Sequence, residues 1–144
     1  MPSDPPISGR CYCGKTQFVG ITSPQAVAYC HCIDCRRVTG APVAAFAAFK
    51  ENAITFQPLL GTPISVSPGV KRWFCKGCGS PVAATYDYLP GQVYVGLGLI
   101  DQAADLPPEI HSHIGAALPW LHIVDDVERN TGSGRDSLTA KADD

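Results

Sequence analysis

The alternation of apolar and polar residues predicts short β-strands along most of the chain. From Val93 to Leu99 every second residue is Val or Leu, and the glycines between them leave space on the other face. Other apolar segments, such as 43–49, are unbroken and have the length of a buried strand. The strands that we expect span residues 16–19, 27–29, 43–49, 53–56, 70–74, 82–86, 93–99 and 109–114.

One segment departs from this pattern and predicts a helix. Residues 33–38 can form one or two helical turns, which Gly40 would close as a C-terminal cap and Pro42 would stop. Because no internal repeat or further helical pattern is present, the predicted fold class is all-β, with twisted antiparallel sheets and at most short helical turns.

The predicted domain spans residues 9–129. Residues 1–8 contain three prolines and few apolar side chains, which indicates a flexible N-terminal lead-in. Residues 130–144 are rich in Gly, Ser and Asp, and we expect a disordered C-terminal tail there.

Composition narrows the class of protein. With 144 residues, of which 45% are hydrophobic, the chain is long enough for a single domain with a sizeable core. A formal net charge of −2 gives no reason to expect a nucleic-acid partner or an anionic membrane. No apolar run approaches the about 18 residues that a membrane span needs, and no secretory signal is recognisable. Together with an odd number of cysteines, this favours reduced thiols and a cytoplasmic location.

All seven cysteines lie in three clusters with Cys-x-Cys or Cys-x-x-Cys spacing, which is typical of metal ligands. A structural zinc site is closed by four protein ligands, whereas a catalytic site has three and keeps a position open. The seven thiols can therefore be divided into four and three. The first set would be Cys11, Cys13, Cys75 and Cys78, and the second would be Cys30, Cys32 and Cys35.

Spacing alone leaves other arrangements open. A zinc ribbon of Cys32, Cys35, Cys75 and Cys78 also satisfies Cys-x-x-Cys spacing. The seven thiols could instead be buried without a metal, although their tight clustering disfavours this interpretation. A thioredoxin-like redox role for the Cys32–Cys35 pair would need a βαβ context, which the pattern does not predict.

Charged side chains flank the clusters. Arg36 and Arg37 directly follow the last ligand and could offset the charge of a three-thiolate site or hold a substrate carboxylate. Exposed surface charges are the ordinary alternative. Lys71 and Arg72, before the last cluster, have the same two interpretations.

Histidines also lie near the clusters. His31 stands between two ligands on an extended segment, so its side chain is expected to point away from them. His111 and His113 would share one strand face and could form a metal-binding pair, but structural histidines are commoner.

The order of these motifs resembles the glutathione-dependent formaldehyde-activating (GFA) enzyme family. The resemblance covers about Ser8 to Arg129, and Pro108, His111 and Pro119-Trp120 fit it more loosely. It is carried by Cys11-x-Cys13, by Cys30-x-Cys32-x-x-Cys35-Arg36-Arg37 with Thr39-Gly40-Ala41-Pro42, and by Arg72-Trp73-Phe74-Cys75-x-x-Cys78-Gly79-Ser80-Pro81.

The resemblance implies a fold, two zinc ions per chain and an activity. The fold would be an Mss4-like arrangement of β-sheets with zinc knuckles. The implied structural zinc lies on Cys11, Cys13, Cys75 and Cys78, and the implied catalytic zinc on Cys30, Cys32 and Cys35. Weaker implied substrate residues are Arg36, Arg37 and His111.

Two functions are compatible with this resemblance. One is a zinc-dependent carbon–sulfur lyase that joins formaldehyde and glutathione to S-hydroxymethylglutathione, or acts on another small thiol adduct. The other is a non-catalytic zinc-stabilised β module that binds a protein partner.

Overall fold

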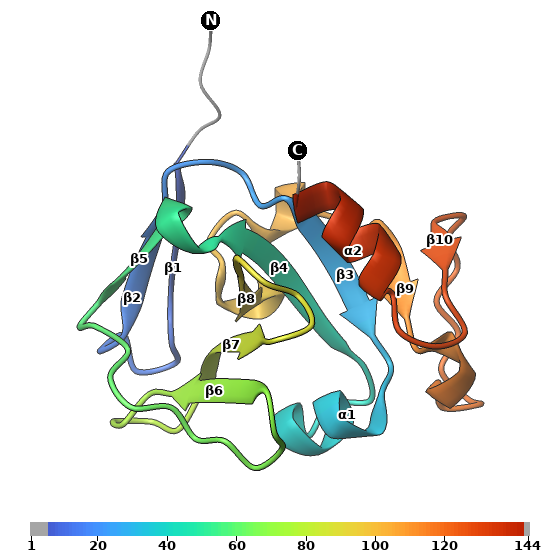
Figure 1. Cartoon of the computed structure of the whole chain (residues 1–144), viewed down its shortest axis with the longest axis horizontal. Coiled ribbons are helices and arrows are strands. Elements are labelled where there is room, and N and C mark those ends of the chain that lie inside the picture. Colours follow the sequence, from blue (N-terminus) through green and yellow to red (C-terminus); the bar gives the residue numbers. More distant parts are fainter. Residues whose placement is uncertain (1–5, 143–144) are drawn as a thin grey trace, which may run out of the picture.

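Two α-helices and ten short strands form within residues 6–142, the part of the chain that the computed structural model describes (Figure 1). The strands are β1 (Ile7–Arg10), β2 (Gln17–Gly20), β3 (Ala26–Cys30), β4 (Ala44–Lys50), β5 (Ile54–Gln57), β6 (Val70–Phe74), β7 (Pro81–Tyr86), β8 (Gln92–Gly96), β9 (Ile110–Ser112) and β10 (Glu128–Arg129). The helices are α1 (Ile33–Thr39) and α2 (Arg135–Ala142), with single 3₁₀ turns at Glu51–Ala53, Leu97–Leu99, Ala103–Asp105 and Ile114–Ala116. The predicted all-β class is confirmed.

The strands make two sheets. The smaller has the order β1-β2-β5 and is antiparallel throughout. The larger has the order β10-β9-β3-β4-β8-β7-β6, and β9 runs parallel to both of its neighbours, β3 and β10. Figure 1 shows the smaller sheet at one side of the molecule and α2 near β3 at the other. The larger sheet therefore has β6 at one edge and β10 at the other.

Strand alternation divides the core between the two faces of the larger sheet. Val27, Phe49 and Val95 face the smaller sheet and pack with its apolar residues, among them Phe18, whose ring centroid lies 5.7 Å from that of Phe56. The residues next to them in sequence face the other way. Ala26, Ala28, Ala48 and Tyr94 are such neighbours, and they form a second cluster with Leu89, Ile110 and Leu138.

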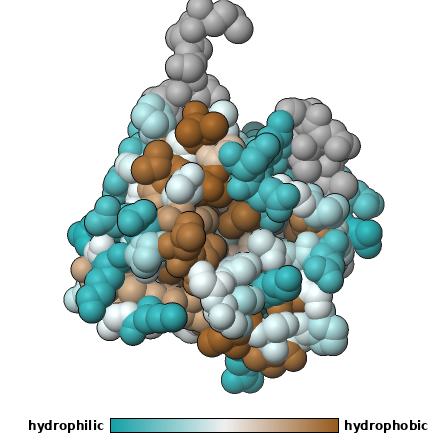
Figure 2. Space-filling view, turned by 60° about the vertical axis from the view of Figure 1, so that its left-hand side comes forward, coloured by the Kyte–Doolittle hydropathy of each residue, from teal (hydrophilic) through white to brown (hydrophobic). Residues whose placement is uncertain are grey.

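The surface of the smaller sheet carries some apolar side chains. Val19 of β2 is 49% exposed and Ile21, which follows that strand, is 67% exposed. Figure 2, in which this side of the molecule comes forward, shows apolar patches set between polar ones. No helix within residues 6–142 has the length and apolar character needed to span a bilayer.

The helical prediction for residues 33–38 is confirmed. Gly40 caps α1 in the left-handed conformation, with φ 72°, and its N–H donates to the carbonyl oxygen of Arg36 at 2.7 Å.

Three other expectations are corrected. The strand expected at 93–99 ends at Gly96 and turns into a 3₁₀ helix. Ile7 is not part of a loose lead-in, because it begins β1 and is only 2% exposed. The tail is helical at Arg135–Ala142, where Leu138 is 6% exposed. The remaining parts of the predicted lead-in and tail, residues 1–5 and 143–144, lie outside the described residues.

Candidate functional site

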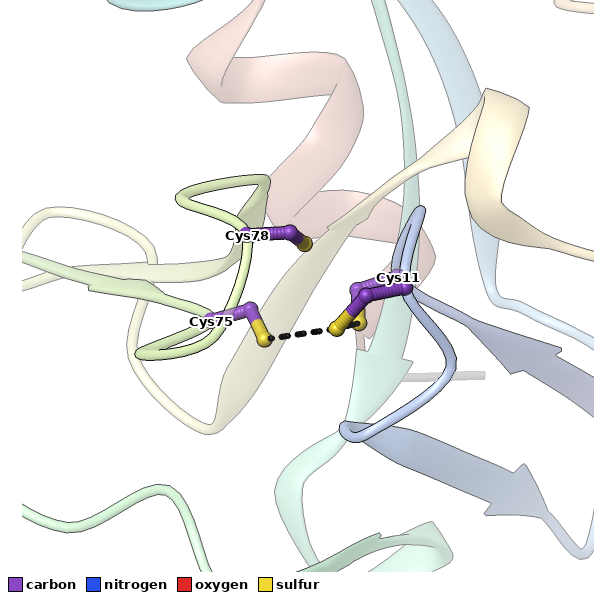
Figure 3. A group of neighbouring side chains, drawn as sticks. Cys11, Cys75 and Cys78 are labelled. Carbon is purple, nitrogen blue, oxygen red and sulfur yellow. Dashed lines mark hydrogen bonds between the residues drawn. The ribbon is translucent and has the colours of Figure 1, made fainter.

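Four thiols meet where two distant turns come together. Cys11 and Cys13 lie on the turn after β1, and Cys75 and Cys78 lie on the turn after β6. Their sulfur atoms are all within 4.8 Å of one another, with Cys13 Sγ 3.7 Å from Cys75 Sγ. Figure 3 shows Cys75 and Cys78 facing Cys11 across this gap. The cluster thus joins the smaller sheet to the edge of the larger one.

Local hydrogen bonds favour the thiolate form of Cys75 and Cys78, whereas the pKa of Cys13 in the same cluster is raised. A hydrogen bond from Thr16 lowers the pKa of Cys75 to about 7, and one from Ser80 lowers the pKa of Cys78 to about 5. The N–H of Gly77 donates to Cys75 Sγ at 3.3 Å. Gly79 has φ 77°, a conformation that favours glycine, and its N–H closes the turn onto the carbonyl oxygen of Cys75 at 2.7 Å.

The three remaining thiols converge at the junction of β3 and α1. Cys30 ends the strand, Cys32 is the N-cap of the helix and Cys35 lies in its first turn. Their sulfur atoms are within 4.8 Å of one another, and the N–H of Cys35 donates to Cys32 Sγ at 3.2 Å. The expected division of the thiols into four and three therefore matches their positions, whereas the ribbon of Cys32, Cys35, Cys75 and Cys78 does not form.

Hydrogen bonds among the three thiols shift their pKa values in opposite directions. Hydrogen bonds from Cys30 and Cys35 lower the pKa of Cys32. Hydrogen bonds with Cys30 and Cys32, together with burial, raise the pKa of Cys35, and the hydrogen bond with Cys32 raises the pKa of Cys30 to about 11. The N-terminal end of α1 adds backbone N–H groups on the same side.

The three-thiol cluster lies in the wall of a cavity of about 200 Å³. The cavity is on the face of the larger sheet turned away from the smaller sheet, because Cys30 and Ala28 alternate with Val27 and Tyr29 along β3. Ser112 Oγ is buried there without a hydrogen-bond partner within the described residues. The other residues of the wall include Asp34, Phe46, Val70, Arg72, Tyr86, Tyr88, Leu89, Tyr94, His113 and Leu138.

Neither arginine that follows the ligands lines this cavity. Arg37 is exposed, and Arg36 is partly buried with its Nε atom lacking a partner within residues 6–142. The cationic side chain that the structure brings to the wall is Arg72, from the far edge of the same sheet.

The two histidines near β9 separate instead of sharing a strand face. His111 is fully buried and its ring contacts His31, so it faces away from the cavity. β9 ends at Ser112, and His113 takes a left-handed backbone, with φ 56°, that brings it to the cavity wall. Neither histidine belongs to a metal-ligand cluster within residues 6–142.

Sequence reasoning missed the aromatic part of the wall. Tyr86, Tyr88 and Tyr94 come from β7, the turn after it and β8, and the sequence contains no local signal that joins them. Burial raises the pKa of Tyr86 and that of Tyr88, the nearby thiols raise both further, and the charge of Arg72 offsets part of the rise. Both hydroxyls therefore stay protonated at neutral pH and can donate hydrogen bonds into the cavity.

The donor sets fit zinc. Zinc in proteins accepts four thiolates in closed sites and three in open ones, and all seven thiols are free rather than joined in disulfides. Backbone N–H groups donate to Cys11, Cys32 and Cys75, which stabilises the thiolate form that a metal needs.

Comparisons with known proteins agree with this arrangement. A crystal structure of a Rhodobacter sphaeroides protein superposes with a TM-score of 0.52 over 85% of this chain and 99% of that chain, at 17% identity, which supports a shared fold. No curated protein sequence matches the chain closely enough for comparison. The model of the family described as glutathione-dependent formaldehyde-activating enzyme matches residues 6–116. Since this match covers most of the chain, the protein belongs to the glutathione-dependent formaldehyde-activating enzyme family.

Proposed function

We propose that the protein is a zinc-dependent carbon–sulfur lyase that makes or breaks the C–S bond of a small thiol adduct, such as S-hydroxymethylglutathione. One observation carries the proposal: the cluster with only three thiols, Cys30, Cys32 and Cys35, lies in a cavity wall. The family description supports glutathione and formaldehyde as the reacting pair.

The two clusters have different roles in this proposal. Cys11, Cys13, Cys75 and Cys78 would hold a structural zinc ion, and Cys30, Cys32 and Cys35 a catalytic one. A zinc ion on three thiolates supplies an open position at which a thiol loses its proton. The four-thiol cluster offers no such position.

The cavity walls contribute binding and proton donation. In adduct formation the S–H bond breaks, the thiol sulfur bonds to the carbonyl carbon, the carbonyl electron pair moves to oxygen, and that oxygen takes up the proton that the thiol has released. The hydroxyls of Tyr86 and Tyr88 are protonated donors in the same cavity and can hydrogen-bond to this oxygen. Phe46 and Leu138 contribute apolar surface to the same wall. In the reverse direction the C–S bond breaks, its electron pair goes to the sulfur, the adduct hydroxyl passes its proton back to that sulfur, and the aldehyde is released while the tyrosine hydroxyls remain hydrogen-bond donors.

We place the reaction in the cytoplasm. All seven thiols are free, and a reducing compartment would keep them available as ligands.

The test is the exchange between free glutathione and S-hydroxymethylglutathione, followed by NMR exchange spectroscopy with zinc-loaded protein. Wild-type protein should accelerate exchange, and Cys32→Ser should abolish the acceleration while leaving the thermal unfolding midpoint nearly unchanged. The control is Ile33→Ala, since Ile33 is the next residue and is 57% exposed. Unchanged exchange in Cys32→Ser would contradict the proposal and favour a non-catalytic zinc module.

A further inference from the structure

We infer that Arg72 binds a carboxylate and that the thiol substrates of this site carry one. The inference rests on the proposed function, because it assumes that the substrate sulfur lies at the three-thiol cluster. It adds a specificity-determining residue that lies 37 or more positions away from that cluster in sequence.

The position of Arg72 follows from the alternation along β6. Val70 and Arg72 line the cavity that contains the thiols, whereas Lys71 between them is exposed. Arg72 also lines a second, mostly apolar cavity of about 250 Å³, and it shares this double position with Phe46 and Tyr94. Arg72 therefore lies between the two cavities and can meet a ligand that extends from the thiols.

The guanidinium is held in place but keeps most of its donors available. Its central carbon lies 5.7 Å from the centroid of the Tyr86 ring, in the range of a cation–π contact. Its Nη1 donates to the Tyr86 hydroxyl at 3.5 Å, a long hydrogen bond. Within residues 6–142, both ion pairs use Asp125, so no carboxylate of the described chain pairs with Arg72.

The charges around the cavity make this residue the natural partner of an anion. Three thiolates and one zinc ion have a net negative charge, and Asp34 lines the same wall. An anionic group of the substrate is repelled there unless a cation offsets it. A planar guanidinium pairs with a carboxylate through two parallel hydrogen bonds, a geometry that an imidazole such as His113 does not provide.

The size of the thiol cavity suits the sulfur end of a substrate rather than the whole of a molecule as large as glutathione. Its volume of about 200 Å³ lies below the about 300–1,000 Å³ of common ligand sites. It can hold the sulfur end of a ligand, and the junction at Arg72 is the place where an acidic group continuing from that end would be held.

The experiment measures binding rather than turnover. Zinc-loaded wild type, Arg72→Gln, Arg72→Lys and Lys71→Gln are titrated by isothermal calorimetry with 3-mercaptopropionate and with the neutral 3-mercaptopropanol. Lys71→Gln removes the same charge from the neighbouring, outward position and is the matched control. Binding of the neutral thiol to each variant reports whether its thiol site is intact.

We expect wild type and Lys71→Gln to bind the acid about tenfold more tightly than the alcohol, as one charge-assisted hydrogen-bonded pair implies. Arg72→Gln should bind both thiols alike, and Arg72→Lys should retain part of the preference. If Arg72→Gln still bound the acid more tightly than the alcohol by the wild-type factor, the inference would be overturned and the proposed function would still stand. If wild type bound neither thiol, the proposed function would fail and the inference with it.

Discussion

The Nε2 atom of His31 lies 2.8 Å from the Nδ1 atom of His111, although 80 positions separate the two residues. The other ring nitrogen of His111, Nε2, donates to Asp125 Oδ2 at 2.9 Å, and Arg129 pairs with the same carboxylate at 2.7 Å. In the neutral form of His111, with Nε2–H donating to Asp125, the Nδ1 atom accepts from Nε2–H of His31. A buried hydrogen-bond network thus links His31, between Cys30 and Cys32, to Asp125 in the C-terminal part of the protein.

Removing His111 from this hydrogen-bond network should destabilise the fold. In His111→Leu, the Nε2–H of His31 loses its buried acceptor and Asp125 loses a donor, so the free energy of unfolding should fall by about 1–3 kcal/mol. Urea unfolding of zinc-loaded protein measures this. His122→Leu is the matched control, since His122 is exposed. Equal free energies of unfolding for the two variants would show that the buried hydrogen-bond network does not stabilise the protein.

A single side chain should hold α2 against the cavity. Leu138 is 6% exposed and packs with Tyr94 and Ile110. Leu138→Ala should weaken the docking of α2 by about 2 kcal/mol and accelerate its amide hydrogen exchange about 30-fold. Arg135→Ala, at the exposed start of the helix, should leave exchange near the wild-type rate. Similar rates in both variants would mean that Leu138 is not the anchor.

Alkaline pH should destabilise the protein through a buried tyrosine. Burial raises the pKa of Tyr94 above its ordinary value of 10.0, and its hydroxyl donates to Gln92 Oε1 at 2.8 Å. Above pH 10 the unfolded chain releases this proton and the folded chain keeps it, so stability falls as pH rises. Each such group removes up to about 1.4 kcal/mol per pH unit.

Urea unfolding between pH 9 and 11 checks this effect. Tyr94→Phe should show a shallower loss of stability with pH than wild type, whereas Tyr12→Phe, which changes a tyrosine that is 87% exposed, should not. If the free energy of unfolding fell equally steeply with pH in wild type and Tyr94→Phe, the alkaline loss of stability would not come from Tyr94.

The four-thiol cluster should be the one on which folding depends. Cys75→Ser leaves an incomplete ligand set between the two sheets, so it should lower the free energy of unfolding by at least about 4 kcal/mol. Cys32→Ser changes a cluster that joins only one strand to one short helix and should cost much less. The two variants are compared by thermal unfolding, with the zinc content of each measured. Equal losses of stability in Cys75→Ser and Cys32→Ser would contradict the assignment of the structural role to the four-thiol cluster.

Local sequence patterns were sufficient for the thiol clusters and the first helix. Cys30, Cys32 and Cys35 converge because extended backbone followed by a helical turn brings residues at these spacings together, a geometry set within six positions. Gly40 ended the helix as expected because only the left-handed conformation closes it there.

Elements that depend on distant contacts could not be predicted. Among the residues of α2 whose burial is described, 135–138, Leu138 is the buried one and the other three are polar, so this part of the sequence does not favour a helix over a disordered tail. His113 reaches the cavity through a single left-handed residue, which the strand pattern does not reveal. Arg72 and Tyr86 meet only because β6 and β7 pair across the edge of the larger sheet.

The central claim is that one thiol cluster is closed and the other can accept a thiol. Replacing zinc by cobalt(II) makes both sites visible in the absorption spectrum, and glutathione can then be titrated into the protein. We predict a spectral change that saturates at one thiol per chain in wild type and is absent in Cys32→Ser. A wild-type spectrum that does not respond to glutathione, or a response that persists in Cys32→Ser, would contradict it.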